Sequence, residues 1–226
     1  FFRLGGHLTP ATELVRFEIT WNGRTDFYPV LISEEIEGRN FHDLSTQDLA
    51  NHLEDEKTLA QWTWLCLGAI LTRPGDGRPS NYVLSPHFLP YCVDNDASFV
   101  EPVIENWRKK KEVHFHTALF CFNVPLSASV IENFCSLDAF EILNSWSSDL
   151  ITKETTYASI FSIDEEKKFY NKDPKNRFRT SLLFKEGALT TLYLQFISLQ
   201  QQLRYRKTLN SFDLFSLILA QEEGVK

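Results

Sequence analysis

The hydrophobic pattern changes from strand-like alternation to helical spacing along the chain. Residues 14–21 alternate in character and are rich in β-branched and aromatic side chains, Asn22-Gly23 is a strong hairpin turn, and residues 27–32 have the composition of a partner strand. From Ser45 onward, apolar residues recur at helical spacing. This order predicts an α+β fold, in which a small antiparallel β unit comes first and a mainly helical region follows.

The helical region begins with two predicted helices that lead to a turn. Ser45 or Thr46 can cap the first helix, which carries apolar side chains within residues 49–53. Residues 59–71 form a mostly apolar second helix, which must stop at Pro74-Gly75 because proline lacks the helical N–H. Short strands are predicted at residues 82–84 and 89–93, and later helices at residues 127–134, 137–150, 188–206 and 212–221.

Composition excludes some classes of function. The net charge of -7 argues against a general nucleic-acid binder, which needs an excess of Lys and Arg to neutralise phosphates. No apolar run approaches the ~18 residues of a membrane span. The cysteines lie in apolar surroundings without metal-ligand spacing and are predicted to be buried, reduced thiols: Cys66, Cys92, Cys121 and Cys135. We therefore expect a cytoplasmic protein with neither a nucleic-acid partner nor a membrane span.

A polar loop with unusual spacing follows the second helix. Residues 76–81 read Asp-Gly-Arg-Pro-Ser-Asn and precede a short apolar strand, and residues 93–96, Val-Asp-Asn-Asp, end the next strand. The first segment resembles the catalytic loop of protein kinases, which has the form D-x-K-P-x-N before an apolar strand. The second resembles the metal-binding D-F-G of the same superfamily. Asn81 follows Asp76 by five residues and precedes Asp94 by thirteen, and both offsets match the family pattern.

This resemblance implies roles for single residues in Mg²⁺-dependent phosphoryl transfer from ATP. Asp76 would orient or deprotonate the acceptor hydroxyl, and Arg78 would contact the transferring phosphate. Asn81 and Asp94 would ligate Mg²⁺. Asp96 stands where the family has glycine, and would be either a second metal ligand or the cap of a following helix. We expect Asp76, Asn81 and Asp94 to converge on one cleft.

A weaker resemblance lies upstream of the loop. Residues 31–38 are similar to the strand, hinge and glycine that link the two lobes of a kinase. The main-chain groups implied to meet the adenine are those of Glu34, Glu35 and Ile36. The resemblance therefore implies a protein-kinase-like fold, with residues 1–36 as a remnant of the N-lobe strands and hinge. Residues 37–226 would be the helical C-lobe that carries both loops.

Several departures place the chain among atypical kinases. Pro74-Gly75 replaces the usual His-Arg, Asn95-Asp96 replaces Phe-Gly, and no A-P-E segment follows. No glycine-rich loop and no Lys precede the hinge, and the chain starts at Phe1 and contains no Met. We expect either a piece of a longer protein or a chain from which modified methionines have been omitted. The pattern resembles actin-fragmin kinases and HipA-like kinases more than the main family, and implies a protein Ser/Thr or small-molecule hydroxyl as acceptor.

Other interpretations of the same residues stay open. Asp-Gly and Pro-Ser-Asn are also good turn material without any catalytic role. A kinase-like pseudoenzyme or interaction scaffold could keep part of the nucleotide site. Asp94 and Asp96 together also resemble the D-x-D of metal-dependent glycosyltransferases, which binds Mn²⁺ and a nucleotide sugar. That reading leaves the loop of residues 76–81 unexplained.

Overall fold

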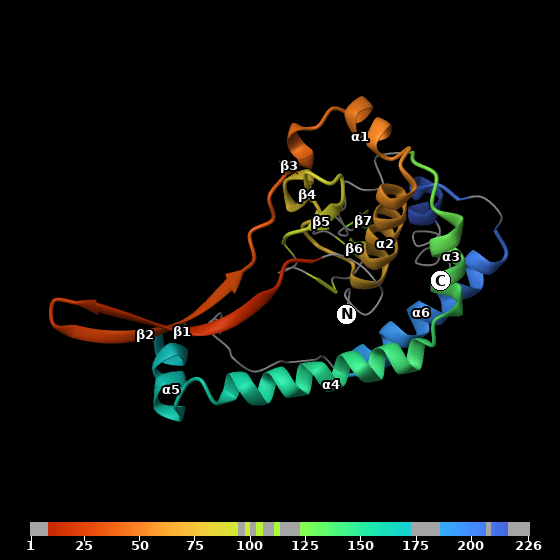
Figure 1. Ribbon diagram of the computed structural model, residues 1–226. Coiled ribbons are helices and arrows are strands. Elements are labelled where there is room, and N and C mark those ends of the chain that lie inside the picture. Colours follow the sequence, from red (N-terminus) through yellow and green to blue (C-terminus); the bar gives the residue numbers. More distant parts are fainter. Residues whose placement is uncertain are drawn as a thin grey trace.

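The computed structural model describes residues 9–94, 98–99, 103–105, 111–113, 123–172, 186–206 and 209–216 (Figure 1). Over these residues the fold is α+β, and the strands form antiparallel sheets in the orders β1-β2, β3-β4-β5 and β6-β7. No helix among them is both long and apolar enough to cross a membrane.

The elements follow in this order along the chain. The strands are β1 (Thr12–Trp21), β2 (Arg24–Ser33), β3 (Arg39–Asn40), β4 (Tyr82–Leu84), β5 (Pro90–Cys92), β6 (Val103–Glu105) and β7 (Lys111–Val113). The helices are α1 (Thr46–His52), α2 (Glu56–Thr72), α3 (Ala128–Ser136), α4 (Ala139–Ala158), α5 (Ile163–Lys172) and α6 (Ala188–Arg204), with 3-10 turns at Phe41–Asp43 and Pro79–Asn81.

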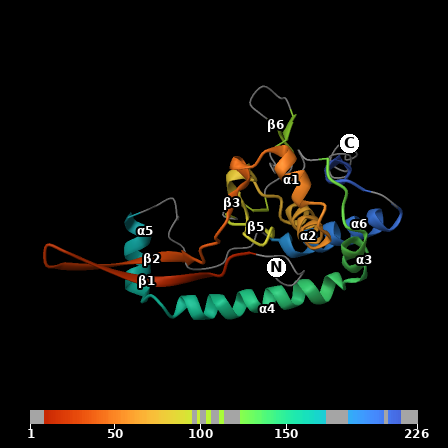
Figure 2. The same cartoon turned by 45° about the horizontal axis from the view of Figure 1, so that its top comes forward.

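The predicted N-terminal hairpin is confirmed and is longer than expected. β1 pairs with β2 along their whole length, from Thr12 opposite Ser33 to Trp21 opposite Arg24. Asn22 and Gly23 form the turn with φ values of 52° and 72°, which suit a two-residue turn that follows the twist of the strands. Figures 1 and 2 show the hairpin projecting from the helical body, with α5 beside it.

The core forms around α2, the helix predicted to be mostly apolar. Trp62 of α2 is fully buried and stacks on Phe41, with 5.9 Å between ring centroids. On another side of the core, Phe134 of α3 stacks on Phe196 of α6 at 4.8 Å. The buried Gln200 amide donates to the carbonyl of Phe134 in α3 and to that of Leu137 directly after it, which ties α3 to α6. The helices thus enclose one apolar cluster, on which the three-stranded sheet sits.

The predicted first residues of the helices agree with the structure better than the predicted last residues do. Of the two predicted caps, Ser45 and Thr46, it is Ser45 that caps α1, and it also forms a capping box with Asp48. α4 continues to Ala158 instead of stopping at residue 150, and its last turns are rich in Thr whose hydroxyls bond back to the helix carbonyls. The segment 212–221 was predicted as a helix, and residues 211–216 are helical while the rest lies outside the described residues.

Two features were missing from the prediction. The region after residue 96 was expected to be mainly helical, but β6 and β7 pair there as short strands, too short to show alternation in the sequence. α5 was not predicted because it is polar, although Ser162 and Glu165 have the spacing of a capping box. Cys66, Cys92 and Cys135 are free thiols, of which Cys135 is only half-buried, and Cys121 lies outside the described residues.

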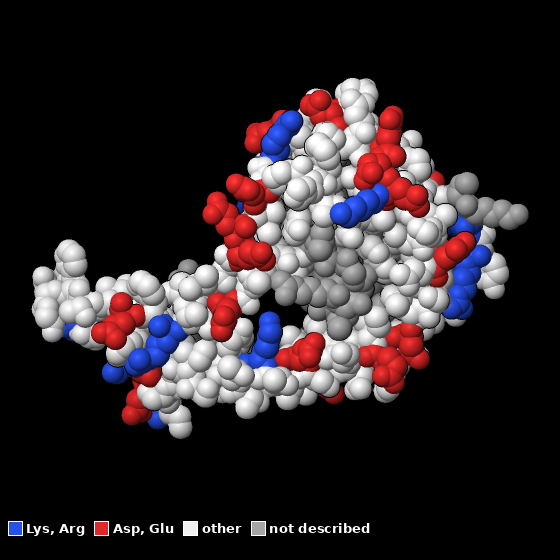
Figure 3. All heavy atoms as spheres, in the orientation of Figure 1, with Lys and Arg blue, Asp and Glu red and all other residues white. Residues whose placement is uncertain are grey.

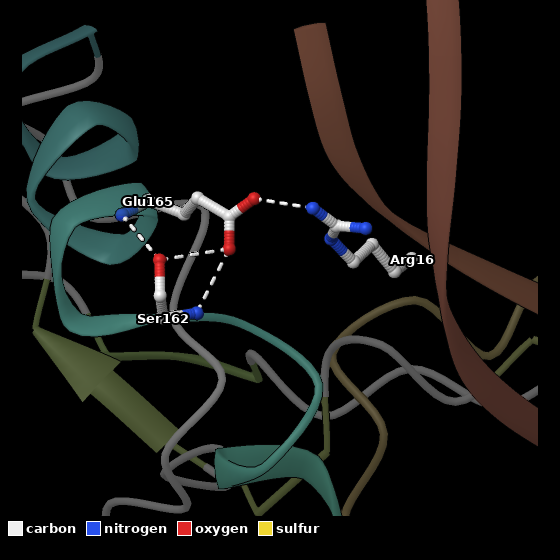
Figure 4. Close-up of polar contacts among 3 residues, drawn as sticks. All are labelled: Arg16, Ser162 and Glu165. Atoms are coloured by element: carbon white, nitrogen blue, oxygen red, sulfur yellow. Dashed lines mark hydrogen bonds and ion pairs between the residues drawn. The ribbon is translucent and has the colours of Figure 1, made fainter.

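An ion pair joins the hairpin to α5 (Figure 4). Arg16 of β1 donates to Glu165 Oε1 at 2.6 Å, and its guanidinium lies 3.4 Å from the ring centroid of Phe27. The backbone N–H and hydroxyl of Ser162 donate to Glu165 Oε2 at 2.8 and 2.9 Å. These hydrogen bonds, from Arg16 first and then from Ser162, lower the pKa of Glu165 from 4.5 to about 2.

The lowered pKa makes a prediction about acid stability. The folded protein favours the charged form of Glu165. The stabilisation that this charged carboxylate gives the fold is therefore fully present above its ordinary pKa near 4.5 and is lost as pH falls through about 2. The difference in unfolding free energy between the wild type and Glu165→Gln should therefore be constant near neutral pH and shrink in acid. Denaturant unfolding at a series of pH values measures it. A difference that stays unchanged down to about pH 2 would contradict this assignment.

Gly38 follows the hinge-like segment and lies against β4. Its φ is +157°, and a Cβ added there would overlap the carbonyl oxygen of Leu84 and come within 2.7 Å of Val83 Cγ1. A side chain at this position therefore cannot be accommodated without moving the backbone of β3 or β4. Glycine is therefore required at this position by its contact with β4.

Replacing Gly38 with Ala should destabilise the protein by about 2 kcal/mol or more, since backbone strain and overlap add. Gly187→Ala is the matched control, because Gly187 also has a positive φ of +77° but has nothing within 4 Å of an added Cβ. Denaturant unfolding should show a clearly smaller loss for Gly187→Ala. Equal losses for the two variants would mean that the contact with β4 is not tight.

Candidate functional site

The predicted catalytic loop starts at a sharp turn after α2. The helix ends at Thr72, and Arg73 adopts a left-handed conformation (φ 46°, ψ 69°) while its N–H still donates to the carbonyl of Ala69. In the amide orientation that satisfies both groups, Gln195 Oε1 of α6 accepts from the Arg73 guanidinium at 2.9 and 3.2 Å. The helix thus stops before Pro74-Gly75, as predicted, and the first residue of the turn is anchored to α6.

Asn81 closes the loop with its side chain. Asn81 Nδ2 donates to the carbonyl oxygen of Asp76 at 2.6 Å, and the Asn81 backbone N–H donates to the carbonyl of Arg78 at 3.0 Å. Pro79 begins the 3-10 turn between them, a position where a missing N–H costs nothing. Asn81 is only 5% exposed, so the amide is held inside the loop.

A hairpin brings the second motif next to this loop. β4 and β5 are antiparallel, with Tyr82 opposite Cys92, and beyond that pair the N–H of Val93 donates to the carbonyl of Asn81 at 2.9 Å. Asp94 is the next residue. Two hydrogen bonds therefore join Asn81 to Asp76 and to Val93, the residue before Asp94, at the same end of the β4–β5 hairpin.

Both ends of the Asn81 amide are engaged within the loop. Nδ2 donates to the Asp76 carbonyl, and Oδ1 accepts from the Ser80 hydroxyl at a long 3.4 Å. From the other side of the loop, Asn40 Nδ2 donates to the Ser80 carbonyl at 2.7 Å. β3, which follows the hinge-like segment, is thereby fixed to the loop.

Arg78 lies beside Asp76 at the surface. Arg78 Nη2 is 2.9 Å from Asp76 Oδ2, and the side chains of Arg78 and Asp76 are 62% and 42% exposed. An ion pair exposed to this extent contributes little to stability, about 1 kcal/mol at most. It does keep a cation next to the carboxylate.

The donors at this site are oxygen atoms. Asn81 Oδ1 and the Asp94 carboxylate are the predicted ligands within the described residues, and Asp96 lies outside them. No group of three or more His, Cys, Asp or Glu side chains gathers at metal-binding distance in the part of the chain that the structure describes. Mg²⁺ needs few protein ligands, because it keeps several waters and takes others from substrate phosphates. The amide and carboxylate oxygens fit that preference.

The hinge-like segment, residues 34–36, follows β2, and one of its backbone N–H groups already donates a hydrogen bond within the hairpin. Glu34 N–H donates to the carbonyl of Ala11 at 2.7 Å, and Ala11 N–H donates to Glu34 Oε2 at 2.9 Å. An adenine ring could therefore not use the Glu34 N–H without breaking the start of the hairpin. The adenine contacts implied for the main chain of Glu35 and Ile36 stay predictions.

A cleft of about 550 Å³ lies between the base of the hairpin and α4. Ile32, Ser33 and Glu34 line one side, and Lys153 and Tyr157 of α4 are on the other. Figure 3 shows this part of the molecule as hollowed between the hairpin and the helical body. The sequence does not predict that α4 lines this cleft, because no local pattern relates residues 152–157 to the hinge-like segment.

Comparisons of the chain with models of protein families, with curated proteins and with solved structures gave no match.

Proposed function

We propose that this chain is an atypical, kinase-like phosphotransferase that uses ATP and Mg²⁺ to phosphorylate a hydroxyl group, with protein Ser or Thr as the first candidate acceptor. One observation carries the proposal. Asn81 bonds through its side chain to Asp76 and through its backbone to Val93, which assembles two motifs separated in the sequence at one hairpin end. A turn without a chemical role needs the first of these bonds, but it needs no acidic residue directly after the second.

Each residue has a role in this proposal. Mg²⁺, when bound, would neutralise charge on the β- and γ-phosphates. Asn81 Oδ1 and the Asp94 carboxylate would hold it. The Asp76 carboxylate, at the exposed mouth of the loop, would accept the proton of the acceptor hydroxyl. Arg78 would move from Asp76 to the transferring phosphate, since an exposed ion pair is easily exchanged.

A cytosolic setting belongs to the same proposal. Cys66, Cys92 and Cys135 are free thiols, as is usual for proteins in a reducing compartment. ATP and Mg²⁺ are both abundant there.

A non-catalytic, kinase-like scaffold is the second candidate, and two contacts favour it. Arg78 forms an ion pair with Asp76, the predicted base, at 2.9 Å. The Glu34 N–H, at the predicted adenine site, is committed to Ala11. In this alternative the loop of residues 76–81 would serve as a rigid support for the three-stranded sheet.

Isothermal titration of the full chain with ATP decides between these candidates. The enzyme proposal expects binding in MgCl₂ that disappears in EDTA, and transfer of labelled phosphate to a protein acceptor or to the chain itself. UDP-glucose with Mn²⁺ is the control for the glycosyltransferase reading and should give no heat. Absence of Mg²⁺-dependent nucleotide binding would reject the enzyme and leave the scaffold.

A further inference from the structure

The last carbonyl group of α2 accepts a hydrogen bond from a residue that follows Asp94. The last four carbonyls of a helix have no partner within the helix, and a buried one needs a donor from elsewhere. Thr72, the last residue of α2, is only 3% exposed, and its carbonyl accepts from the backbone N–H of Phe99. Five residues after Asp94, the chain therefore returns to the helix end from which the loop of residues 76–81 departs.

The side chain of Phe99 is held at the same place. Its ring centroid lies 5.9 Å from that of Trp146 in α4, within the range of favourable aromatic pairs. Trp146 belongs to the apolar core, whereas Phe99 is 50% exposed. One backbone hydrogen bond and one aromatic contact thus anchor Phe99 to α2 and α4.

The two residues that meet at this helix end both have a left-handed backbone. The φ angle is 46° at Arg73 and 62° at Phe99, which is unfavourable for residues with a side chain. Such conformations persist only where surrounding contacts impose them. Gln195 of α6 holds Arg73, while Thr72 and Trp146 hold Phe99. Tertiary contacts, and not local preference, therefore determine where the chain runs after Asp94.

Residues 94–98, called the Asp94 segment here, are fixed at both ends. Before the segment, the N–H of Val93 donates to the carbonyl of Asn81 at 2.9 Å, and after it the N–H of Phe99 donates to that of Thr72. A short loop that is closed at both ends has far less conformational freedom than one with a free end.

We propose that Phe99 is a positioning residue for the candidate site. Its anchor restricts the Asp94 segment beforehand, so that less ordering is needed when Mg²⁺ binds to Asp94. The consequence for Mg²⁺ rests on the proposed function, whereas the anchor itself rests on the contacts of Phe99 alone.

Phe99→Gly tests the anchor, because it removes the ring while glycine adopts a positive φ without strain. Phe88→Gly is the matched control. Phe88 also has a positive φ of 58° and is 46% exposed, but its ring stacks on His52, and it lies in the turn at the other end of the β4–β5 hairpin from Asn81. Hydrogen exchange of the full chain without nucleotide, followed by mass spectrometry, should be about two- to tenfold faster at residues 93–99 in Phe99→Gly and unchanged there in Phe88→Gly.

Isothermal titration with ATP in MgCl₂ tests the positioning role on the same preparations. Phe99→Gly should bind ATP about two- to tenfold more weakly than the wild type, because the freed segment must be ordered on binding. Phe99→Tyr keeps the ring and should bind like the wild type, as should Phe88→Gly. Thermal melting followed by circular dichroism verifies that all three variants are folded.

The outcomes separate this role from the proposed function. A wild type without Mg²⁺-dependent ATP binding would overturn both together. A wild type that binds, with Phe99→Gly equally tight or Phe88→Gly equally weakened, would overturn the role of Phe99 alone. Exchange at residues 93–99 that is no faster in Phe99→Gly than in Phe88→Gly would remove the anchor, and with it the role.

Discussion

Asp94→Ala is expected to abolish Mg²⁺-dependent ATP binding and, with it, any phosphotransfer. The carboxylate is the one charged metal ligand predicted within the described part of the site, and it follows directly on Val93, whose N–H is bonded to Asn81. Loss of outer partners of metal ligands alone weakens binding 10- to 100-fold, so loss of this carboxylate should weaken ATP binding by roughly 100-fold or more. Isothermal titration in MgCl₂ measures the change.

The fold should survive this substitution. The thiol of Cys92 donates a hydrogen bond to the backbone carbonyl of Asp94 at 3.6 Å, and alanine keeps that carbonyl. Asp149→Ala is a suitable control, because Asp149 is exposed in the middle of α4 and alanine is a good helix former. Unchanged melting temperatures for both variants would show that a loss of binding is local. If Asp94→Ala bound ATP as tightly as the wild type in MgCl₂, the metal role of Asp94 would be wrong.

Local sequence signals predicted the parts of the fold that depend on neighbouring residues. The hairpin was predictable because Asn22-Gly23 demands positive φ angles that few other pairs adopt. Ser45 was a reliable helix start because a capping box depends on residues within one turn. The end of α4 was less predictable, since it depends on weak propensities along a Thr-rich surface.

Contacts between distant parts of the chain had no local signal. Arg16 and Glu165 are separated by 149 positions, and neither residue's neighbours indicate the other. The cleft between Ser33 and α4 is of the same kind, because it exists only where two separate elements approach each other. The hairpin was readable from the alternation of its residues, but which of its faces would meet α5 was not.

Spacing in the sequence predicted that Asp76, Asn81 and Asp94 belong to one site, and their convergence stays a prediction. The hydrogen bonds of Asn81 join it to the carbonyl of Asp76 and to the N–H of Val93, which spacing cannot show. The engagement of the Glu34 N–H by Ala11 was hidden, because strand pairing continued past the predicted end of the hairpin. The role of Asp76 in any reaction stays a prediction, for which the loop geometry allows a sharp test.

Asp76→Ala should separate binding from transfer. Asn81 bonds to the backbone carbonyl of Asp76, so removing the carboxylate leaves the loop closed and Asn81 Oδ1 in place. The variant loses the exposed contact with Arg78, which costs about 1 kcal/mol at most. Mg²⁺-dependent ATP binding should therefore remain close to that of the wild type, while phosphotransfer falls by about 10²-fold or more, the usual scale for a positioned acid–base group.

Titration and a labelled-phosphate assay on the same preparation measure both. Loss of binding equal to that of Asp94→Ala would place Asp76 among the metal ligands, and full transfer activity would remove it from the reaction.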